Sequence, residues 1–287
     1  MIIDSHQHFW DLESVEYPWL VPAYGPIFRS FQPAELEPQL RAVGIDRTVL
    51  VQAANSLADT DAMLAHATDL EWIGAVVGWV PLEDPEEAAR VLDEGWMPHP
   101  RFRGVRHLNH NEADPDWLIR PAVIEGLRVL EARALVAEVV AVYPLHLGHV
   151  PTLARACPDL RIVVDHLAKP PIASGDLAAW KRDLAAAGAH PNVAAKISGL
   201  NTAADWVAWA AEDLTEAIGH AIDVFGVERL MVGSDWPVAI LAGDHGRVWT
   251  ETLRALDLLG VQGSDRDALL GGTAARIYDI RDDAGGL

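Results

Sequence analysis

Met1-Ile-Ile-Asp-Ser-His-Gln-His8 is a short apolar segment that ends in two histidines one residue apart. Alternate residues of a β-strand point to the same face, so the side chains of His6 and His8 are expected to lie together. Neutral imidazole is the commonest metal ligand, which makes a metal ion the obvious target of such a pair. An isolated His-x-His segment is more often two solvated or packed histidines. Its meaning therefore depends on the ends of the other strands.

Seven further apolar segments bounded by turn residues give, with residues 2–6, eight strand candidates. The seven are 47–54, 72–80, 102–107, 135–142, 160–166, 192–198 and 229–235. Segments rich in Ala, Leu and Glu predict helices between them, at 60–70, 84–94, 121–132, 176–188 and 206–225. Apolar strands that alternate with helices indicate an α/β protein with a parallel sheet, and eight such units predict one (β/α)8 TIM barrel over residues 1–287. A doubly wound open sheet is the alternative, but no strand candidate is followed by its glycine-rich fingerprint.

The composition suits one large core and excludes several classes of partner. The chain has 287 residues, 50% of them hydrophobic, and 22 Lys and Arg against 42 Asp and Glu give a formal net charge of −20. Such a charge repels nucleic acids and anionic membrane surfaces, and it disfavours a polyanionic substrate. Cys157 is the single cysteine, so no internal disulfide can form, and we expect it to pack rather than react. Neither a signal peptide nor a membrane-spanning run is recognisable, so a cytoplasmic protein with a small-molecule substrate is expected.

The residues that close the predicted strands carry most of the information about function, because the active site of a (β/α)8 barrel lies where its strands end. These residues are too polar for a packing layer: His6, His8, Gln52, Trp79, Arg106, His107, His166, Lys196, Ser198 and Asp235. Buried polar groups cost free energy unless they have partners. A ring of them at one barrel end therefore predicts that a ligand, water or metal ion supplies part of the partnering.

Several charged residues in the strands have more than one interpretation. Glu138 lies inside an apolar run, so either its carboxylate faces the barrel mouth or the strand is misplaced. Lys196 could pair with a carboxylate, bind a substrate oxygen or have lost its proton. Asp165 and His166 are adjacent, and the alternation of a strand lets only one of them point inward without choosing between them. Asp235, at the end of the last strand, is a general-base candidate or a structural carboxylate.

A long aromatic-rich connection at about 9–32 follows the first strand, with Trp10 and Trp19 among its rings. Long connections on the working face of a barrel commonly cover the substrate, and flat rings suit the apolar face of a sugar or lactone ring. The rings are equally compatible with packing the connection onto the barrel.

Residues away from the strand ends are given structural roles. The remaining histidines are assigned to solvent or helix caps: His66, His99, His110, His146, His149, His190, His220 and His245. Three tryptophans in the later helices are expected on the surface, where they leave room for a homodimer: Trp180, Trp206 and Trp209.

Eight stretches in a fixed order carry a resemblance that covers the whole chain. They are Asp4-Ser-His-Gln-His-Phe-Trp10, Tyr17-Pro-Trp-Leu20, Gly44-Ile-Asp-Arg-Thr-Val-Leu-Val-Gln-Ala53, Val77-Gly-Trp79, Phe102-Arg-Gly-Val-Arg-His107, Asp165-His-Leu-Ala-Lys-Pro170, Lys196-Ile-Ser-Gly-Leu200 and Gly233-Ser-Asp-Trp-Pro-Val238. With them the sequence resembles the amidohydrolase superfamily, amidohydrolase 2 type. More narrowly it resembles the lactonase branch, whose members include L-fuconolactonases and 2-pyrone-4,6-dicarboxylate lactonases.

The resemblance implies a (β/α)8 barrel whose polar centre is His6, His8, His166 and Asp235, which favours His166 over its neighbour. In the wider superfamily these positions bind one or two divalent metal ions, helped by a carboxylated Lys or a Glu on a middle strand and by a further His. This sequence lacks a second middle-strand His and an obvious bridging lysine, although Glu138 is a candidate substitute. The resemblance therefore implies one divalent metal ion, zinc, or none, and it leaves open whether the reaction needs the metal.

The resulting hypothesis is a hydrolase that opens a sugar-acid lactone. Asp235 takes a proton from the water that attacks the lactone carbonyl, while the three imidazoles, with or without a metal, steady the oxyanion. The substrate is expected to be bound by Arg106, Lys196, Trp10, Trp19 and Trp236. The alternatives are a metal-dependent decarboxylase of the same superfamily and, in another class, a sugar-acid binding protein without catalysis.

Overall fold

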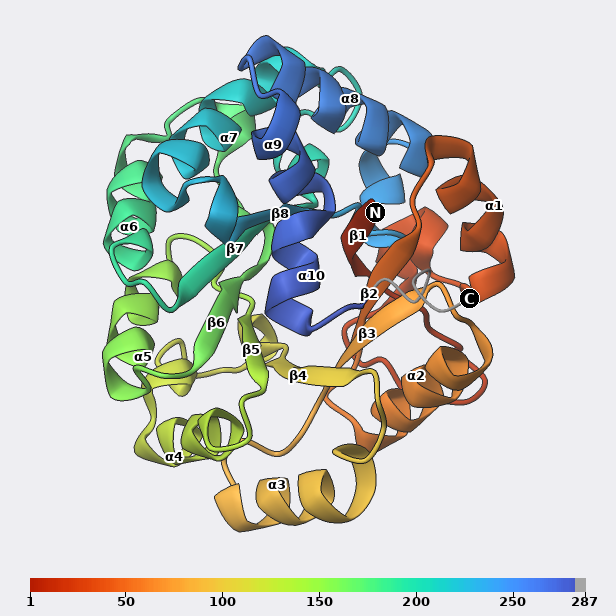
Figure 1. Cartoon of the computed structure of the whole chain (residues 1–287), viewed down its shortest axis with the longest axis vertical. Coiled ribbons are helices and arrows are strands. Elements are labelled where there is room, and N and C mark those ends of the chain that lie inside the picture. The colour runs from red at the N-terminus through yellow and green to blue at the C-terminus, as the bar shows by residue number, and fades with distance from the viewer. Residues whose placement is uncertain (282–287) are drawn as a thin grey trace.

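A computed structural model describes residues 1–281 and shows one sheet of eight parallel strands in chain order (Figure 1). The strands are β1 (Ile3–Gln7), β2 (Arg47–Val51), β3 (Ile73–Gly78), β4 (Phe102–His107), β5 (Val136–Val139), β6 (Arg161–Val164), β7 (Val193–Ile197) and β8 (Leu230–Val232). Each strand pairs in parallel with the next. Parallel neighbours in sequence order are the hallmark of a (β/α)8 barrel, so the predicted fold is confirmed.

The barrel closes between β1 and the chain that follows β8. The backbone N–H of Asp235 donates to the His6 carbonyl at 2.8 Å, and that of His8 donates to the Trp236 carbonyl at 2.8 Å. Gly233 allows this approach, because a Cβ there would lie 2.8 Å from the His6 nitrogen. The first and last strands are thereby joined at the level where the predicted site residues lie.

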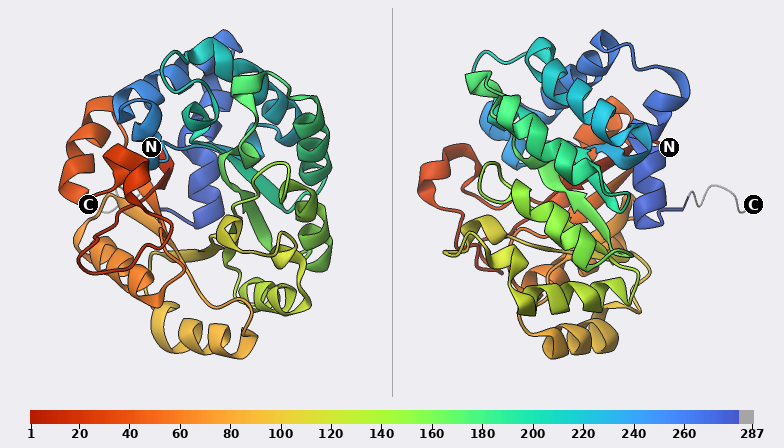
Figure 2. Two further views of the ribbon diagram at one scale, coloured as in Figure 1. Left: turned by 180° about the vertical axis from the view of Figure 1, so that it is seen from behind. Right: turned by 90° about the vertical axis from the view of Figure 1, so that its left-hand side faces the viewer.

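Helices cover the outside of the barrel, as the views from behind and from the side show (Figure 2). They are α1 (Pro33–Val43), α2 (Leu57–Asp69), α3 (Pro85–Val91), α4 (Pro121–Glu131), α5 (Val150–Ala156), α6 (Ala178–Gly188), α7 (Ala211–Phe225) and α8 (His245–Leu258), followed by α9 (Gly263–Asp267) and α10 (Thr273–Tyr278). In α4 the buried residues Val123, Leu127 and Leu130 recur at helical spacing and form the face that packs on the barrel. Gly126 on the same helix lies so close to the Leu82 carbonyl that a Cβ would be 2.2 Å from its oxygen.

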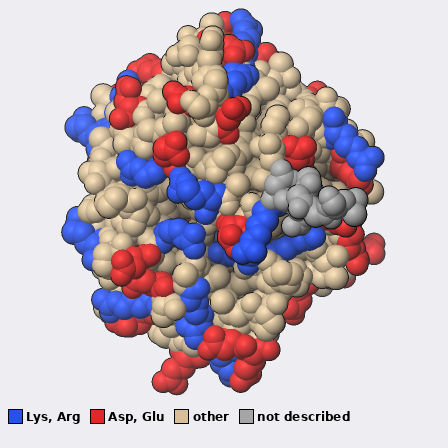
Figure 3. All heavy atoms as spheres, viewed as in Figure 1, with Lys and Arg blue, Asp and Glu red and all other residues tan. Residues whose placement is uncertain are grey.

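The C-terminal helix α10 closes the end of the barrel that faces the viewer in Figure 1. Ile277 and Tyr278 pack there with strand residues such as Val49 and Val163 in a separate buried apolar cluster. Arg161 on the rim donates from Nη1 to the Ile277 carbonyl at 2.9 Å. On the surface of this face, basic and acidic side chains are interspersed (Figure 3). The open mouth is the opposite end, where the long connection after β1 lies in the side view of Figure 2.

All eight predicted strands and all five predicted helices are present, with two informative differences at the strand ends. β6 ends at Val164 rather than 166, and β8 ends at Val232 rather than 235. The extra residues belong to the turns that build the site. Within residues 1–281 no helix combines the length and apolar character needed to cross a bilayer.

The expected surface tryptophans are a correction. Trp180 and Trp209 are buried, with 0% and 2% of their surface exposed, and only Trp206 lies on the surface. The Trp180 indole donates to the Leu167 carbonyl at 2.8 Å, so this ring packs α6 onto the turn after β6. Cys157 is buried, and burial raises the pKa of its thiol to about 11, as expected for a packing residue.

Candidate active site

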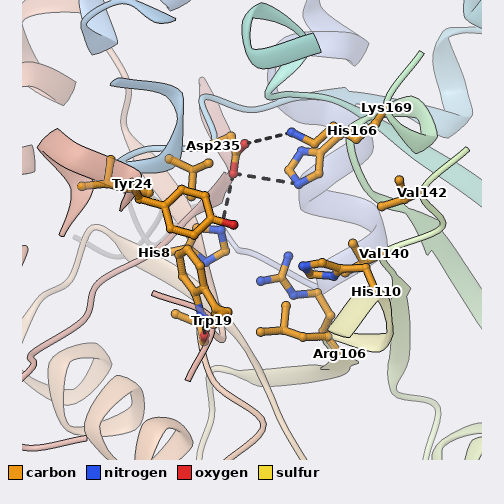
Figure 4. Close-up of a pocket in the computed structure, with 14 residues that line it drawn as sticks. His8, Trp19, Tyr24, Arg106, His110, Val140, Val142, His166, Lys169 and Asp235 are labelled. Atoms are coloured by element: carbon orange, nitrogen blue, oxygen red, sulfur yellow. Dashed lines mark hydrogen bonds and ion pairs between the residues drawn. The ribbon is translucent and has the colours of Figure 1, made fainter. Parts of the chain in front are cut away.

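Asp235 lies at the barrel mouth among three imidazoles, of which Figure 4 shows those of His8 and His166. Its Oδ1 is 3.5 Å from Nε2 of His8, 3.8 Å from Nε2 of His6 and 3.9 Å from Nε2 of His166. All four side chains are buried. The structure therefore brings together the four residues predicted as the polar centre, from the first, middle and last parts of the chain.

His6 and His8 lie side by side, as the alternation of β1 predicts. Their Nε2 atoms are 3.1 Å apart. Nδ1 of His8 lies 2.7 Å from the Val51 carbonyl, and a carbonyl only accepts, so Nδ1 carries the proton. The Nε2 of His8 therefore faces the site.

His166 reaches the site through a turn rather than a strand, which corrects the argument from alternation. Beyond Val164 the chain leaves the sheet, and His166 has a left-handed φ of 54°. Both Asp165 and His166 consequently contribute. Asp165 accepts from Arg106 Nη1 at 3.0 Å and lies 3.4 Å from Nδ1 of His6, while Nδ1 of His166 is 2.9 Å from the Ser198 hydroxyl. The rule that one of two adjacent residues points outward fails because the strand has already ended.

The donor set fits a divalent metal ion. One group of potential ligands comprises His6, His8 and Asp235, and a second comprises His6, Asp165 and His166. Imidazole nitrogens with one carboxylate oxygen are the ligand types that zinc takes, and the carbonyl behind His8 is the kind of outer partner that orients a ligand histidine. Oδ1 of Asp235 faces the Nε2 atoms of His8 and His6 at 3.5 and 3.8 Å. A cation at this site would partner the carboxylate and these nitrogens.

Burial favours the neutral forms of His6 and His166. It lowers the pKa of His166 to about 3, and burial together with the neighbouring Lys196 lowers the pKa of His6 well below its usual value. Burial would raise the pKa of Asp235, but His166, Lys169, His8 and His6 outweigh it and hold that pKa well below its usual range. The site thus combines an ionised carboxylate with neutral nitrogen ligands.

A layer of paired charges lies at the Nδ1 edge of His6, away from the Nε2 atoms that face Asp235. Lys196 Nζ is 2.6 Å from Oε1 of Glu138 and 3.2 Å from Nδ1 of His6. The Tyr278 hydroxyl also donates to Glu138 Oε1. Burial raises the pKa of Glu138 to about 7, against the opposing effect of Lys196. The strand is placed as predicted, but the Glu138 carboxylate does not line the cavity at the mouth: it pairs with Lys196 and with Tyr278 of α10, and it lies outside both groups of potential metal ligands.

A cavity of about 190 Å³ opens onto Asp235 and its imidazoles. The lining residues are His8, Trp19, Tyr24, Ile27, Ala53, Arg106, Leu108, His110, Val140, Val142, His166, Lys169, Asp235 and Val238. Two of the predicted substrate-binding residues, Arg106 and Trp19, are among them. The other three are not: Lys196 is fully buried in the charged layer, and Trp10 and Trp236 pack against Phe31.

Sequence reasoning missed three polar residues of this site. Lys169 and His110 line the cavity, where His110 is exposed as its assignment to solvent implies, and Asp165 connects Arg106 to His6. Lys169 stands in the Asp165–Pro170 stretch, and His110 shortly follows the fourth strand, so both positions carried a signal. His146 and His245 depart from their assignment, since 4% and 1% of their surface is exposed.

The family model for amidohydrolases matches residues 3–280. The chain belongs to the amidohydrolase family. It is 38% identical to an L-fucono-1,5-lactonase of Burkholderia ambifaria over 97% of this chain and 95% of the relative, and 36% identical to an L-fucono-1,5-lactonase of Burkholderia multivorans over 98% and 97%. A crystal structure of an amidohydrolase from Burkholderia multivorans with bound zinc superposes with a TM-score of 0.91 at 34% identity, covering 98% of this chain and 100% of that one.

Proposed function

We propose that this amidohydrolase opens the ring of an aldono-1,5-lactone, such as L-fucono-1,5-lactone, by hydrolysis. The observation that carries the proposal is the position of Asp235, whose Oδ1 faces three imidazole Nε2 atoms within 3.9 Å on the wall of a small cavity. The lactonases of 36% and 38% identity, which cover nearly the whole chain, support the class of reaction. A carboxylate beside neutral nitrogen ligands is what water-activated acyl transfer needs.

Asp235 is the general base of the proposed reaction. Burial opposes ionisation of its carboxylate, but the positive charge of Lys169, 3.7 Å from Oδ2, helps to hold its pKa below the usual range. A water placed between Asp235 and the imidazoles gives a proton to the carboxylate while its oxygen forms a bond to the lactone carbonyl carbon. Asp235 later returns the proton to the ring oxygen when the bond from that oxygen to the carbonyl carbon breaks.

The groups opposite Asp235 stabilise the negative charge that develops on the carbonyl oxygen. Arg106 lines the cavity, and Asp165, which accepts from its Nη1 at 3.0 Å, fixes the guanidinium. Zinc held by His6, His8, His166 and Asp235 would supply a Lewis acid for the carbonyl and a lower pKa for a bound water.

The cavity walls favour a neutral hydroxylated ring. Trp19 and Tyr24 offer flat aromatic surfaces, Val140 and Val142 offer apolar contacts, and Asp235 is the one carboxylate among the described lining residues. A formal net charge of −20 disfavours the approach of a polyanion. A monosaccharide lactone satisfies both conditions, since it carries no charge and presents one apolar face.

The experiment is a pH-indicator assay of the purified protein across a panel of aldonolactones, because each turnover releases one acid. We expect hydrolysis of at least one 1,5-lactone, with L-fucono-1,5-lactone first in the panel. Tight binding of these lactones without any release of acid would contradict the proposal and favour the non-catalytic sugar-acid binding protein. Decarboxylation of an aromatic acid without lactone hydrolysis would favour the other alternative.

A further inference from the structure

The turn after β6 has an unusual backbone that places two side chains on one side. His166, Leu167, Ala168 and Lys169 have φ values of 54°, 49°, 62° and 55°, and none of them is glycine. Such runs are disfavoured for L-residues, and strain of this kind persists where the surrounding structure imposes it, commonly at functional sites. The Lys169 N–H donates to the His166 carbonyl at 2.9 Å. Residues three apart in so tight a turn eclipse one another, so Lys169 projects beside His166 toward Asp235.

The ammonium of Lys169 is held in place by the end of β7 and the turn after it. Its Nζ donates to the Thr202 hydroxyl at 2.9 Å and to the Gly199 carbonyl at 3.4 Å. The Thr202 hydroxyl donates to the same carbonyl at 2.8 Å, so its lone pair is the acceptor for Lys169. An ammonium has three N–H donors, which leaves one for the cavity that Lys169 lines.

Asp235 separates two different environments, as Figure 4 shows. Oδ1 faces the three imidazoles, whereas Oδ2 lies 3.7 Å from Nζ of Lys169. The other strong cation of the cavity wall, Arg106, donates to Asp165 and to the Gln52 carbonyl on the imidazole side. Among the described lining residues, Lys169 is therefore the cation placed on the Oδ2 side of the carboxylate.

Building on the proposed lactone hydrolysis, we propose that Lys169 is a catalytic residue that stabilises the negative charge on the ring oxygen as it leaves. The attacking water gives one proton to Asp235 and forms the new bond to the carbonyl carbon. When the tetrahedral intermediate collapses, the electron pair of the breaking C–O bond passes to the ring oxygen, and Asp235 gives that oxygen the proton. Lys169 keeps its own protons and stabilises the negative charge on the ring oxygen. Asp235 delivers its proton to the same oxygen, so Lys169 and Asp235 have to be adjacent. Fixed charges aimed at developing charge are among the largest contributions to catalysis.

The test compares two leaving atoms in substrates of the same shape: L-fucono-1,5-lactone and its analogue with sulfur in the ring. A thiolate needs far less stabilisation than an alkoxide, so a cation at the leaving atom matters for oxygen and little for sulfur. The variants are Lys169→Met, which keeps the length of the side chain, and Lys169→Arg, which keeps the charge. Lys181→Met, which removes a surface lysine paired with Glu216 at 2.8 Å, is the matched control.

We expect Lys169→Met to lower kcat on the oxygen lactone by about 100-fold or more, and on the sulfur analogue by less than about tenfold. Lys169→Arg should recover part of the loss on the oxygen lactone, and Lys181→Met should change neither rate. Equal losses on both substrates, or a rise in KM with kcat unchanged, would overturn the proposal and leave Lys169 a binding or structural residue. The melting temperatures of the Lys169 variants should lie near that of the wild type, which excludes misfolding as the cause of the difference in kcat between the two substrates. A wild-type protein inactive on both substrates would instead refute the proposed function.

Discussion

Nε2 of His8 lies 3.5 Å from Oδ1 of Asp235, which joins the end of the first strand to the turn after the last. The contact depends on closure of the barrel, because β1 and the turn after β8 are hydrogen-bonded through the backbone at His6 and Asp235. The proposed catalytic site and the closure of the barrel thus lie at the same place, between β1 and the turn after β8. Because the closing hydrogen bonds join backbone atoms, substitution of the side chains of His8 and Asp235 should alter metal binding and activity more than the stability of the fold.

Removal of one imidazole should weaken metal binding strongly. His8→Ala deletes a nitrogen that faces the site, so we expect the zinc dissociation constant to rise at least about 100-fold, since even outer partners of metal ligands are worth about 10- to 100-fold. Zinc titration of the metal-free protein measures the constant. His149→Ala, at a surface histidine paired with Asp116, is the control. Unchanged zinc affinity in His8→Ala would exclude His8 as a ligand.

Metal removal also bears on the decarboxylase alternative, which requires a tightly bound metal. Retained lactone hydrolysis after chelation would argue against that alternative and would show that the side chains suffice.

Gly199 should tolerate no side chain, because a Cβ there would lie 2.3 Å from Oδ2 of Asp235 and its φ is 59°. We expect Gly199→Ala to displace the carboxylate and to lower kcat by about 100-fold, in line with the sensitivity of catalysis to misplacement of about 1 Å. Gly175→Ala is the matched control, since Gly175 has a φ of 72° with no atom within 4 Å of the added Cβ. Both variants should lose about 1–2 kcal/mol of stability from the left-handed backbone, but only the first should lose activity. Equal kcat values for the two variants would be inconsistent with this geometry.

The tryptophans of the long connection should divide into two classes. Trp19 lines the cavity and is half-buried, so Trp19→Ala should raise KM several-fold and change the melting temperature little. Trp10 is buried and its indole donates to the Arg29 carbonyl at 2.6 Å, so Trp10→Ala should cost about 3–5 kcal/mol of stability. Steady-state kinetics and urea unfolding separate the two. A stability loss without a change in KM for Trp19→Ala would assign that ring to packing as well.

The stability of the metal-free protein should fall as the pH falls below 6.5, the unfolded pKa of histidine. Burial lowers the folded pKa of His6, His107 and His166, so below pH 6.5 the unfolded state binds protons that the folded state does not. Glu138 acts in the opposite direction between about pH 7 and its unfolded pKa of 4.5, because its folded pKa is raised. Burial also lowers the pKa of His66, His99, His110 and His146, so the histidines outweigh Glu138 and leave a net loss of stability, at roughly 1.4 kcal/mol per proton per pH unit.

Urea unfolding at pH 7.5, 6.5 and 5.5 measures this dependence. Glu138→Gln removes the opposing group and should steepen the decline. A free energy of unfolding that rises toward pH 5.5 would contradict the neutral state of the buried imidazoles.

Much of the architecture could be predicted from the sequence, because each strand is an apolar run and each helix carries an apolar face. The pairing of His6 with His8 followed from alternation, and it holds although the register of β1 against β2 shifts between Asp4 and Gln7. The contribution of both Asp165 and His166 could not be predicted that way, because their placement depends on a left-handed turn that no local rule for non-glycine residues anticipates.

The residues that line the cavity could likewise be predicted where they lie on a regular strand and not where they lie in a turn. Arg106 closes a regular strand and was found, whereas Lys169 lies beyond a strand end and was not. The burial of Trp180 was missed because an indole that donates to a loop carbonyl needs the tertiary structure to be recognised. Lys196 was left with three interpretations, and its contact with Glu138 at 2.6 Å selects the ion pair.

The most direct test of the central claim is hydrolysis of L-fucono-1,5-lactone by the wild type and by Asp235→Asn under identical conditions. The variant keeps the size of the side chain and removes the base, so we predict that kcat/KM falls by about 100- to 10,000-fold while the melting temperature stays close to that of the wild type. A well-folded Asp235→Asn protein whose kcat/KM stays within about threefold of the wild-type value would contradict the account.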